Sequence, residues 1–153
     1  MKAPLPVLCV ALLASAASLT HCTGGDDDGG PPPPPRCVEN LNVDCTKLLY
    51  EPPIYSKVFA QSIEKTCTLG SSCHSADGAM GGLVLVNADD TYDALLGLKG
   101  GVKRVLPNDP KCSPLMVRFT SRDPNYVMPR GAPFVAEELC DFVQWIKQGA
   151  EKN

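Results

Sequence analysis

Cys67-Thr68-Leu69-Gly70-Ser71-Ser72-Cys73-His74 is the stretch around which we expect the folded part of the chain to be organised. It contains two cysteines with five residues between them, and the second cysteine directly precedes a histidine. The chain has only two histidines, and the other one, His21, lies near the N-terminus. Two thiols, the second directly before an imidazole, indicate a site that could attach a group covalently and bind a metal ion.

A cysteine pair that ends in Cys-His is the attachment sequence of c-type haem. The two sulfurs form thioether bonds to the haem, and the histidine is an axial ligand of the iron. The usual spacing is Cys-x-x-Cys-His, whereas five residues separate Cys67 from Cys73. Two other interpretations therefore stay open. One is a Cys67–Cys73 disulfide with His74 at the surface, and the other is zinc bound by Cys67, Cys73, His74 and a further cysteine.

Residues 1–21 are typical of a secretory signal peptide of the lipoprotein type. Lys2 supplies the positive charge, and residues 7–19 are apolar but too short to span a bilayer. The segment Leu19-Thr20-His21-Cys22 resembles a bacterial lipobox, although a histidine replaces the usual small residue before the cysteine. We therefore expect lipidation at Cys22. The alternative is an ordinary signal peptide that is cleaved within residues 14–17.

Residues 22–36 form a linker rich in glycine, aspartate and proline, including five consecutive prolines. Such a segment cannot bury apolar surface, so we expect it to be disordered to semi-rigid. It would tether the folded domain, residues 37–153, to a lipidated Cys22. The protein is then exported and lipid-anchored to a bacterial membrane, facing the periplasm or the exterior.

The charge balance argues against nucleic acid as a partner. The chain has 14 Lys and Arg against 17 Asp and Glu, a formal net charge of −3 at pH 7. No basic patch is visible along the sequence, and binding to a phosphate backbone requires one.

Eight cysteines are present, of which Cys9 and Cys22 belong to the signal peptide and its end. An even number of cysteines in an exported domain is normally oxidised or bound to a cofactor. If haem takes one pair, four disulfide candidates are left. We expect Cys37–Cys45 and Cys112–Cys140 as the two disulfides.

Apolar spacing and helix-end residues predict an all-α domain of short helices and long loops. Leu83-Val84-Leu85-Val86 is either a strand or an extended segment on the core. Phe142 and Trp145 are expected in the core. The predicted helices are 54–66, 92–98, 114–119 and 135–148, with Asp89-Asp90-Thr91 capping the second and Ser113 capping the third.

Five short motifs follow one another between Tyr55 and Ala150. They are Val58-Phe59 with the cysteine–histidine segment; Gly81-Gly82-Leu83-Val84-Leu85; Tyr92-Asp93-Ala94-Leu95-Leu96; Leu106-Pro107-Asn108-Asp109-Pro110 with Ser113-Pro114-Leu115; and Met128-Pro129 with Glu137-Glu138-Leu139 and residues 145–150. Their order and spacing resemble the small c-type cytochrome-like domains of exported bacterial lipoproteins, which are related to the planctomycete cytochrome type.

The resemblance implies an all-α, cytochrome c-like fold around one covalent haem c. Cys67 and Cys73 would hold the haem vinyl groups, and His74 would be the proximal iron ligand through Nε2. Met128 would be the distal ligand, because the family has a Met-Pro in the loop before the last helix. A histidine with a methionine raises the reduction potential of the iron.

The sequence itself limits the other choices of distal ligand. Because the mature domain contains a single histidine, a second histidine from the same chain is excluded. Met80, in a glycine-rich loop, is the alternative to Met128, and Met116 is expected in the core. An open distal site is the remaining alternative.

The resemblance implies single-electron transfer with redox partner proteins. We expect no enzyme activity, because a single mature histidine excludes a Ser-His-Asp arrangement and no Gly-x-Ser-x-Gly motif is present. A peroxidase-like activity at an open haem site is the one catalytic alternative. The alternative function is that of a haem-free, disulfide-stapled lipoprotein module with a cytochrome-like fold, which acts as a binding or structural domain.

Overall fold

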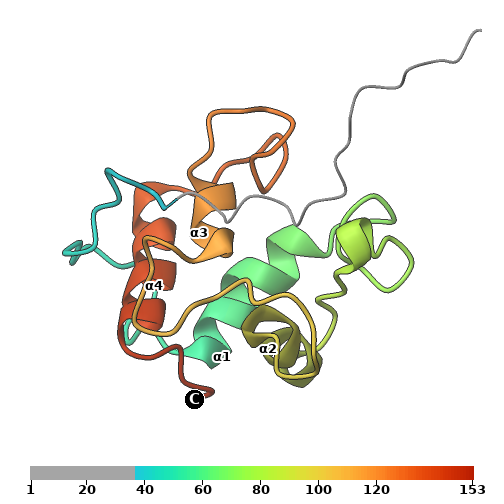
Figure 1. Ribbon diagram of the computed structural model, residues 1–153, viewed down its shortest axis with the longest axis horizontal. Helices are drawn as coiled ribbons and strands as arrows, with labels where there is room; N and C mark the ends of the chain where they lie inside the picture. The colour runs from blue at the N-terminus through green and yellow to red at the C-terminus, as the bar shows by residue number, and fades with distance from the viewer. Residues whose placement is uncertain (1–36) are drawn as a thin grey trace, which may run out of the picture. The chain divides into compact units, whose positions relative to one another are not determined.

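The computed structural model describes residues 37–153, so the predicted signal peptide, lipidated cysteine and linker lie outside the described residues. The described part of the chain is helical and contains no β-strand, which confirms the all-α prediction. Its elements, shown in Figure 1, are α1 (Tyr55–Val58), η1 (Phe59–Cys67), η2 (Met80–Gly82), α2 (Ala88–Leu96), α3 (Pro114–Phe119) and α4 (Ala136–Lys147).

The first predicted helix, 54–66, is present as two consecutive elements. α1 is a single α-helical turn, and η1 continues it as a π-helix that ends at Cys67. Val58 and Ile63 are buried in the core, which agrees with the apolar face predicted for this segment. The wider π-helical turn was not expected from the sequence, although such turns occur often at functional sites.

The second helix begins earlier than predicted. α2 starts at Ala88 because Asn87 is its N-cap, and the side-chain oxygen of Asn87 accepts the backbone N–H of Asp90 at 2.8 Å. The aspartates that we expected to precede the helix therefore lie in its first turn, where negative charge complements the helix dipole. Gly97 ends α2 with a positive φ of 68°, as expected for a glycine at this position.

Ser113 precedes α3 at the predicted N-cap position, but its side chain does not cap the helix. Its hydroxyl donates to the carbonyl of Asp109 at 2.8 Å and accepts the backbone N–H of Leu106 at 2.9 Å. Ser113 is completely buried, so these bonds replace those that its hydroxyl would make with water. The serine thus fixes the turn before α3 rather than the helix itself.

α4 forms the centre of the core and contacts both α1 and α3. Phe142 and Trp145 are buried, as predicted, and Met116 of α3 is buried beside them. Phe142 also forms an aromatic cluster with Phe119 and Phe134, with ring centroids 4.8 to 5.3 Å apart. Aromatic rings at these distances and tilts contribute beyond the area that they bury.

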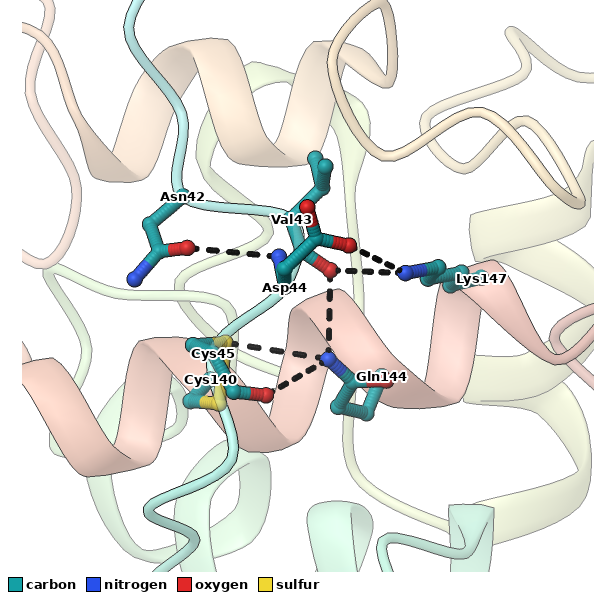
Figure 2. Close-up of polar contacts among 7 residues, drawn as sticks. All are labelled: Asn42, Val43, Asp44, Cys45, Cys140, Gln144 and Lys147. Carbon is teal, nitrogen blue, oxygen red and sulfur yellow. Dashed lines mark hydrogen bonds and ion pairs between the residues drawn. A yellow bond between two sulfur atoms is a disulfide. The ribbon is translucent and has the colours of Figure 1, made fainter.

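The segment before α1 is bound along α4 (Figure 2). Cys45 forms a disulfide with Cys140 of α4, and the side chain of Gln144 donates to the carbonyls of Cys45 and Val43 at 2.8 and 3.3 Å. Lys147 donates to the carbonyl of Val43 at 3.0 Å. Cys140, Gln144 and Lys147 are three or four residues apart and therefore lie on one face of α4. Together they hold the irregular segment in place.

The predicted disulfide pairing is wrong. The structure pairs Cys37 with Cys112 and Cys45 with Cys140, across 75 and 95 residues of sequence. Cys37 and Cys45 lie close in sequence, but the backbone N–H of Val38 bonds to the carbonyl of Lys111 at 2.8 Å, which brings Cys37 beside Cys112. Each disulfide therefore ties the start of the domain to a distant segment.

Candidate functional site

Cys67 is the last residue of η1 and lies at the edge of the core. It is half-buried, packs against the core cluster and is a free thiol. Burial, together with the nearby Glu138 carboxylate and Cys73, raises the pKa of the Cys67 thiol to about 12. The thiol is therefore protonated at neutral pH, and its neighbours include both α4 and the second cysteine of the motif.

The loop between the two cysteines closes on itself. The backbone N–H of Cys73 donates to the carbonyl of Gly70 at 3.3 Å, and the N–H of His74 donates to the carbonyl of Cys67 at 2.9 Å. In an α-helix each N–H bonds to the carbonyl four residues earlier, which is the separation of the first cysteine and the histidine in Cys-x-x-Cys-His. Here the bond joins residues seven apart, so the three additional residues enlarge the loop that it closes.

The imidazole of His74 is oriented by a main-chain carbonyl. Its Nδ1 lies 3.2 Å from the carbonyl oxygen of Leu83. Because a carbonyl only accepts, this contact assigns the proton to Nδ1 and leaves the lone pair on Nε2, the arrangement of a histidine that binds a metal. The backbone N–H of Leu85 donates to the carbonyl of His74 at 2.8 Å, so residues 83–86 run alongside the histidine as an extended segment, not as a strand.

Gly81 and Gly82 bring Leu83 to this position. Both have positive φ angles, 62° and 68°, which residues with a side chain rarely adopt. The two glycines are the last residues of η2, and they turn the chain so that the extended segment returns to His74. The glycine pair of the sequence motif thus has a backbone role in orienting the imidazole.

Met128 lies in the loop between α3 and α4. It is half-buried and packs against the same core as Cys67, and its backbone N–H donates to the carbonyl of Arg118 at 3.1 Å. Met80 is 49% exposed on η2, whereas Met116 is completely buried in α3. Among the described residues, Met128 is therefore the methionine whose burial is intermediate between surface and core.

The structure brings some of the predicted site residues together and not others. Cys67, Cys73 and His74 are joined through the loop and its hydrogen bonds. Met128 shares only the core with Cys67, and no hydrogen bond links it to the cysteine loop. Cys67 and Cys73 are both free thiols, so the third disulfide of the haem-free alternative is not formed.

The zinc interpretation is wrong for the part of the chain that the structure describes. No three His, Cys, Asp or Glu side chains of residues 37–153 are grouped closely enough to hold a metal ion. The other four cysteines in this range are all in disulfides, so none of them is available as a further thiolate ligand.

Two surface cavities lie away from the cysteine loop. The larger, about 880 Å³, is bordered by the segment before α1 and by Leu139 and Val143 of α4. The smaller, about 470 Å³, is bordered by Leu83, Ala94 and Arg104. Neither is lined by Cys67, Cys73, His74 or Met128, so neither provides the site for a ligand bound through them.

The sequence reasoning missed two contributors to the site. The carbonyl of Leu83 orients His74, and the carboxylate of Glu138 lies near Cys67. A main-chain acceptor has no signature of its own in a sequence. The glycine pair before Leu83 was the available indication, because it predicts a sharp turn at this point.

Comparison with known protein families was decisive for the segment that includes the histidine. Residues 71–130 match the family model of planctomycete cytochrome C. The match supports a cytochrome-c-like domain of this type. No curated protein and no solved structure is significantly similar to the chain.

The match to planctomycete cytochrome C contains Cys73, His74 and Met128, but it begins after Cys67 and ends before α4. It confirms the family resemblance inferred from the sequence motifs. Residues 67–70, which include the first cysteine of the motif, lie outside the matched segment.

Proposed function

We propose that this protein is a membrane-tethered c-type cytochrome that carries one covalent haem and transfers single electrons outside the cytoplasm. The observation that carries the proposal is the 2.9 Å hydrogen bond from the N–H of His74 to the carbonyl of Cys67. It gives the long loop the backbone bond that a Cys-x-x-Cys-His turn has. The backbones of Cys67 and His74 therefore stay within one hydrogen bond of each other despite the additional residues between them.

The residues present fit a haem. Cys67 and Cys73 are free thiols and would supply the two thioether sulfurs. His74 would bind iron through Nε2, because its Nδ1 is already bonded to the carbonyl of Leu83. Met128 would be the distal ligand. The bound haem would supply the one-electron redox chemistry, and a His–Met ligand pair would favour its reduced state.

The chain's own contribution is to orient the ligand and exclude water. The Leu83 carbonyl keeps the imidazole of His74 in one tautomer and one rotation, which is the usual function of such an acceptor. Cys67 packs against the apolar core, so a haem attached through it would have an apolar surrounding on that side. A low-polarity surrounding of this kind raises the reduction potential of a bound haem.

Export and tethering are part of the proposal and rest on the N-terminal sequence. Two disulfides in the described domain agree with an oxidising compartment. Between residues 37 and 153, no helix combines the length and apolar character needed to cross a bilayer. The anchor would be the lipid on Cys22, at the far end of the linker.

The experiment is an absorption spectrum and an intact mass of the full chain, exported from a host with c-type haem maturation. We expect a Soret band that survives denaturation and acid–acetone extraction, and a mass increase of one haem. Replacing the only candidate proximal ligand, His74→Ala, should abolish the low-spin spectrum.

A colourless protein with unmodified Cys67 and Cys73 would contradict the proposal. That result would leave the alternative, a haem-free module stapled by disulfides, and its partner would have to be identified directly. The intact mass also reports any lipid on Cys22, so tethering and haem attachment are tested in one sample.

A further inference from the structure

The loop that contains the candidate haem-attachment residues is held by one side chain, Ser75. The hydroxyl of Ser75 donates to the carbonyl of Gly70 at 3.0 Å and accepts the backbone N–H of Gly78 at 3.1 Å. It therefore joins a residue before Cys73 to one after His74. No other serine or threonine hydroxyl of the described loop makes two such bonds to its backbone.

The backbone of Gly78 packs closely against the carbonyls of Ser71 and Cys73 in the loop. A Cβ added to Gly78 would lie 2.3 Å from the carbonyl oxygen of Cys73 and 2.8 Å from that of Ser71. Both neighbours are backbone atoms, so neither can move aside without opening the loop. The carbonyl of Cys73 also accepts the N–H of Met80 at 3.3 Å, which holds the chain beyond Gly78 against the loop.

We propose that Ser75 and Gly78 are positioning residues that hold the three additional residues of the loop aside, so that Cys73 and His74 follow Cys67 as in a Cys-x-x-Cys-His turn. This inference rests on the proposed function, because it concerns attachment of the haem. In a Cys-x-x-Cys-His motif the helical turn itself positions the second cysteine and the histidine. Here Ser75 and Gly78 would do so.

The position of the Ser75 bonds explains how a single hydroxyl can hold the loop closed. Cys73 and Gly70 already share a backbone hydrogen bond, so the loop has one tight turn at this point. Ser75 binds the same Gly70 carbonyl from the far side of His74. The loop is then closed on both sides of the Cys73-His74 pair, and the orientation of the pair is determined before any haem arrives.

The test compares covalent haem content among variants of the full exported chain, measured as haem absorbance per protein after denaturation. Ser75→Ala should lower the haem content severalfold. Ser75→Thr keeps the hydroxyl and should restore it. Ser72→Ala is the matched control, because Ser72 is an exposed serine of the same loop without a side-chain hydrogen bond to it, and it should load like the wild type.

A shortened chain separates positioning from general support of the fold. Deleting residues 69–71 leaves Cys67-Thr68-Ser72-Cys73-His74, which has the usual spacing and lacks the Gly70 acceptor. In this background Ser75→Ala should have no effect on haem content. A merely structural serine would reduce the haem content equally in both backgrounds, and that result would overturn the inference.

The remaining outcomes distinguish this inference from the proposed function. If the wild type carries haem and Ser75→Ala loads like Ser72→Ala, the positioning role is wrong and the cytochrome function stands. If the wild type carries no haem, with or without loading of the shortened chain, the proposed function of the natural protein is wrong and the positioning role is wrong with it.

Discussion

At the scale of single residues, Met128 is distinguished by its environment. It is half-buried against the core, whereas Met80 is half-exposed on η2 and Met116 is completely buried. A distal ligand must be close to the core and still able to reach a bound haem. Met128 packs against the core from a loop position, and the proposed function assigns it as this ligand.

The first prediction concerns this ligand. Met128→Ala should abolish the sulfur-to-iron charge-transfer band of the oxidised protein and lower its reduction potential, because a thioether ligand favours the reduced iron. Met80→Ala is the control and should leave both unchanged. Loss of the band in Met80→Ala and not in Met128→Ala, measured by absorption spectroscopy and redox titration, would reverse the assignment.

The second prediction concerns Gly78 in the haem-free chain. Gly78→Ala places a Cβ against two backbone carbonyls, and such overpacking should lower the free energy of unfolding by about 1 to 3 kcal/mol. Gly101→Ala is the matched control, since its added Cβ meets open space at an ordinary φ. Equal urea midpoints for the two variants would contradict the close approach.

At the scale of elements, α1 is capped by Asn153, which is distant in sequence. The backbone N–H groups of Tyr55 and Ser56 donate to the side-chain oxygen and the carbonyl of Asn153 at 2.8 and 2.9 Å. These N–H groups have no partner within α1 itself. Asn153 thus performs the function of an N-cap across a separation of almost the whole domain.

The third prediction follows from this contact. Asn153→Ala should lower the free energy of unfolding by about 1 kcal/mol, the usual cost of a lost N-cap. Asn153→Asp keeps the acceptor oxygen and adds a negative charge at a helix N-terminus, so it should be as stable as the wild type. Chemical denaturation of the three proteins checks this, and equal loss in both variants would contradict the capping role.

α4 also carries a buried carboxylate. The carboxylate of Asp141 is completely buried and accepts the backbone N–H groups of Leu49 and Tyr50 at 3.2 Å. Burial raises its pKa above 3.8, and the nearby Glu138 adds to the rise. Asp44 is the opposite case, because the adjacent Lys147 lowers the pKa of this exposed carboxyl.

The fourth prediction is that Asp141 and Asp44 change the free energy of unfolding with pH in opposite directions. Since the pKa of Asp141 is raised in the folded state, the folded chain binds more protons than the unfolded chain above pH 3.8. The stability of the wild type relative to Asp141→Asn should therefore fall as the pH rises from 3.8 through the raised pKa. The pKa of Asp44 is lowered in the folded state, so the unfolded chain binds more protons below pH 3.8. The stability of the wild type relative to Asp44→Asn should therefore rise with pH in the window below 3.8. Parallel slopes in denaturation curves across pH would contradict both directions.

At the scale of the whole domain, the two disulfides compensate for short helices. The four α-helices of residues 37–153 have between 4 and 12 residues, too few for stability from helix formation alone. Both disulfides close long loops, of 75 and 95 residues, and bind the start of the domain to α4 and to the turn before α3. Small exported domains are commonly stabilised in this way.

The fifth prediction tests this staple. Replacing either pair by serines should lower the free energy of unfolding by about 4 to 5 kcal/mol in the chain-entropy estimate for such loops. The two losses should be nearly equal, because the estimate varies only slowly with loop length. Cys67→Ser in the haem-free chain removes no disulfide and should cost much less. An equal cost for Cys67→Ser in thermal unfolding would indicate a disulfide at that position.

The sequence alone determined the helical class, the core residues and the central motif. The apolar spacing around Phe142 and Trp145 identified α4, because a helix in a small domain must bury one face. The Cys67–His74 stretch indicated the chemistry, because few cofactors require two thiols beside an imidazole. Short-range signals of this kind depend only on neighbouring residues.

Only the tertiary structure decided how distant parts meet. Six cysteines allow fifteen disulfide pairings, and the choice depends on which segments become neighbours in the fold rather than on their separation in sequence. The closure of the long loop and the Leu83 carbonyl on His74 are likewise backbone contacts, formed by atoms that every residue has. Such atoms have no residue-specific signature, so their partners emerge only when the chain has folded.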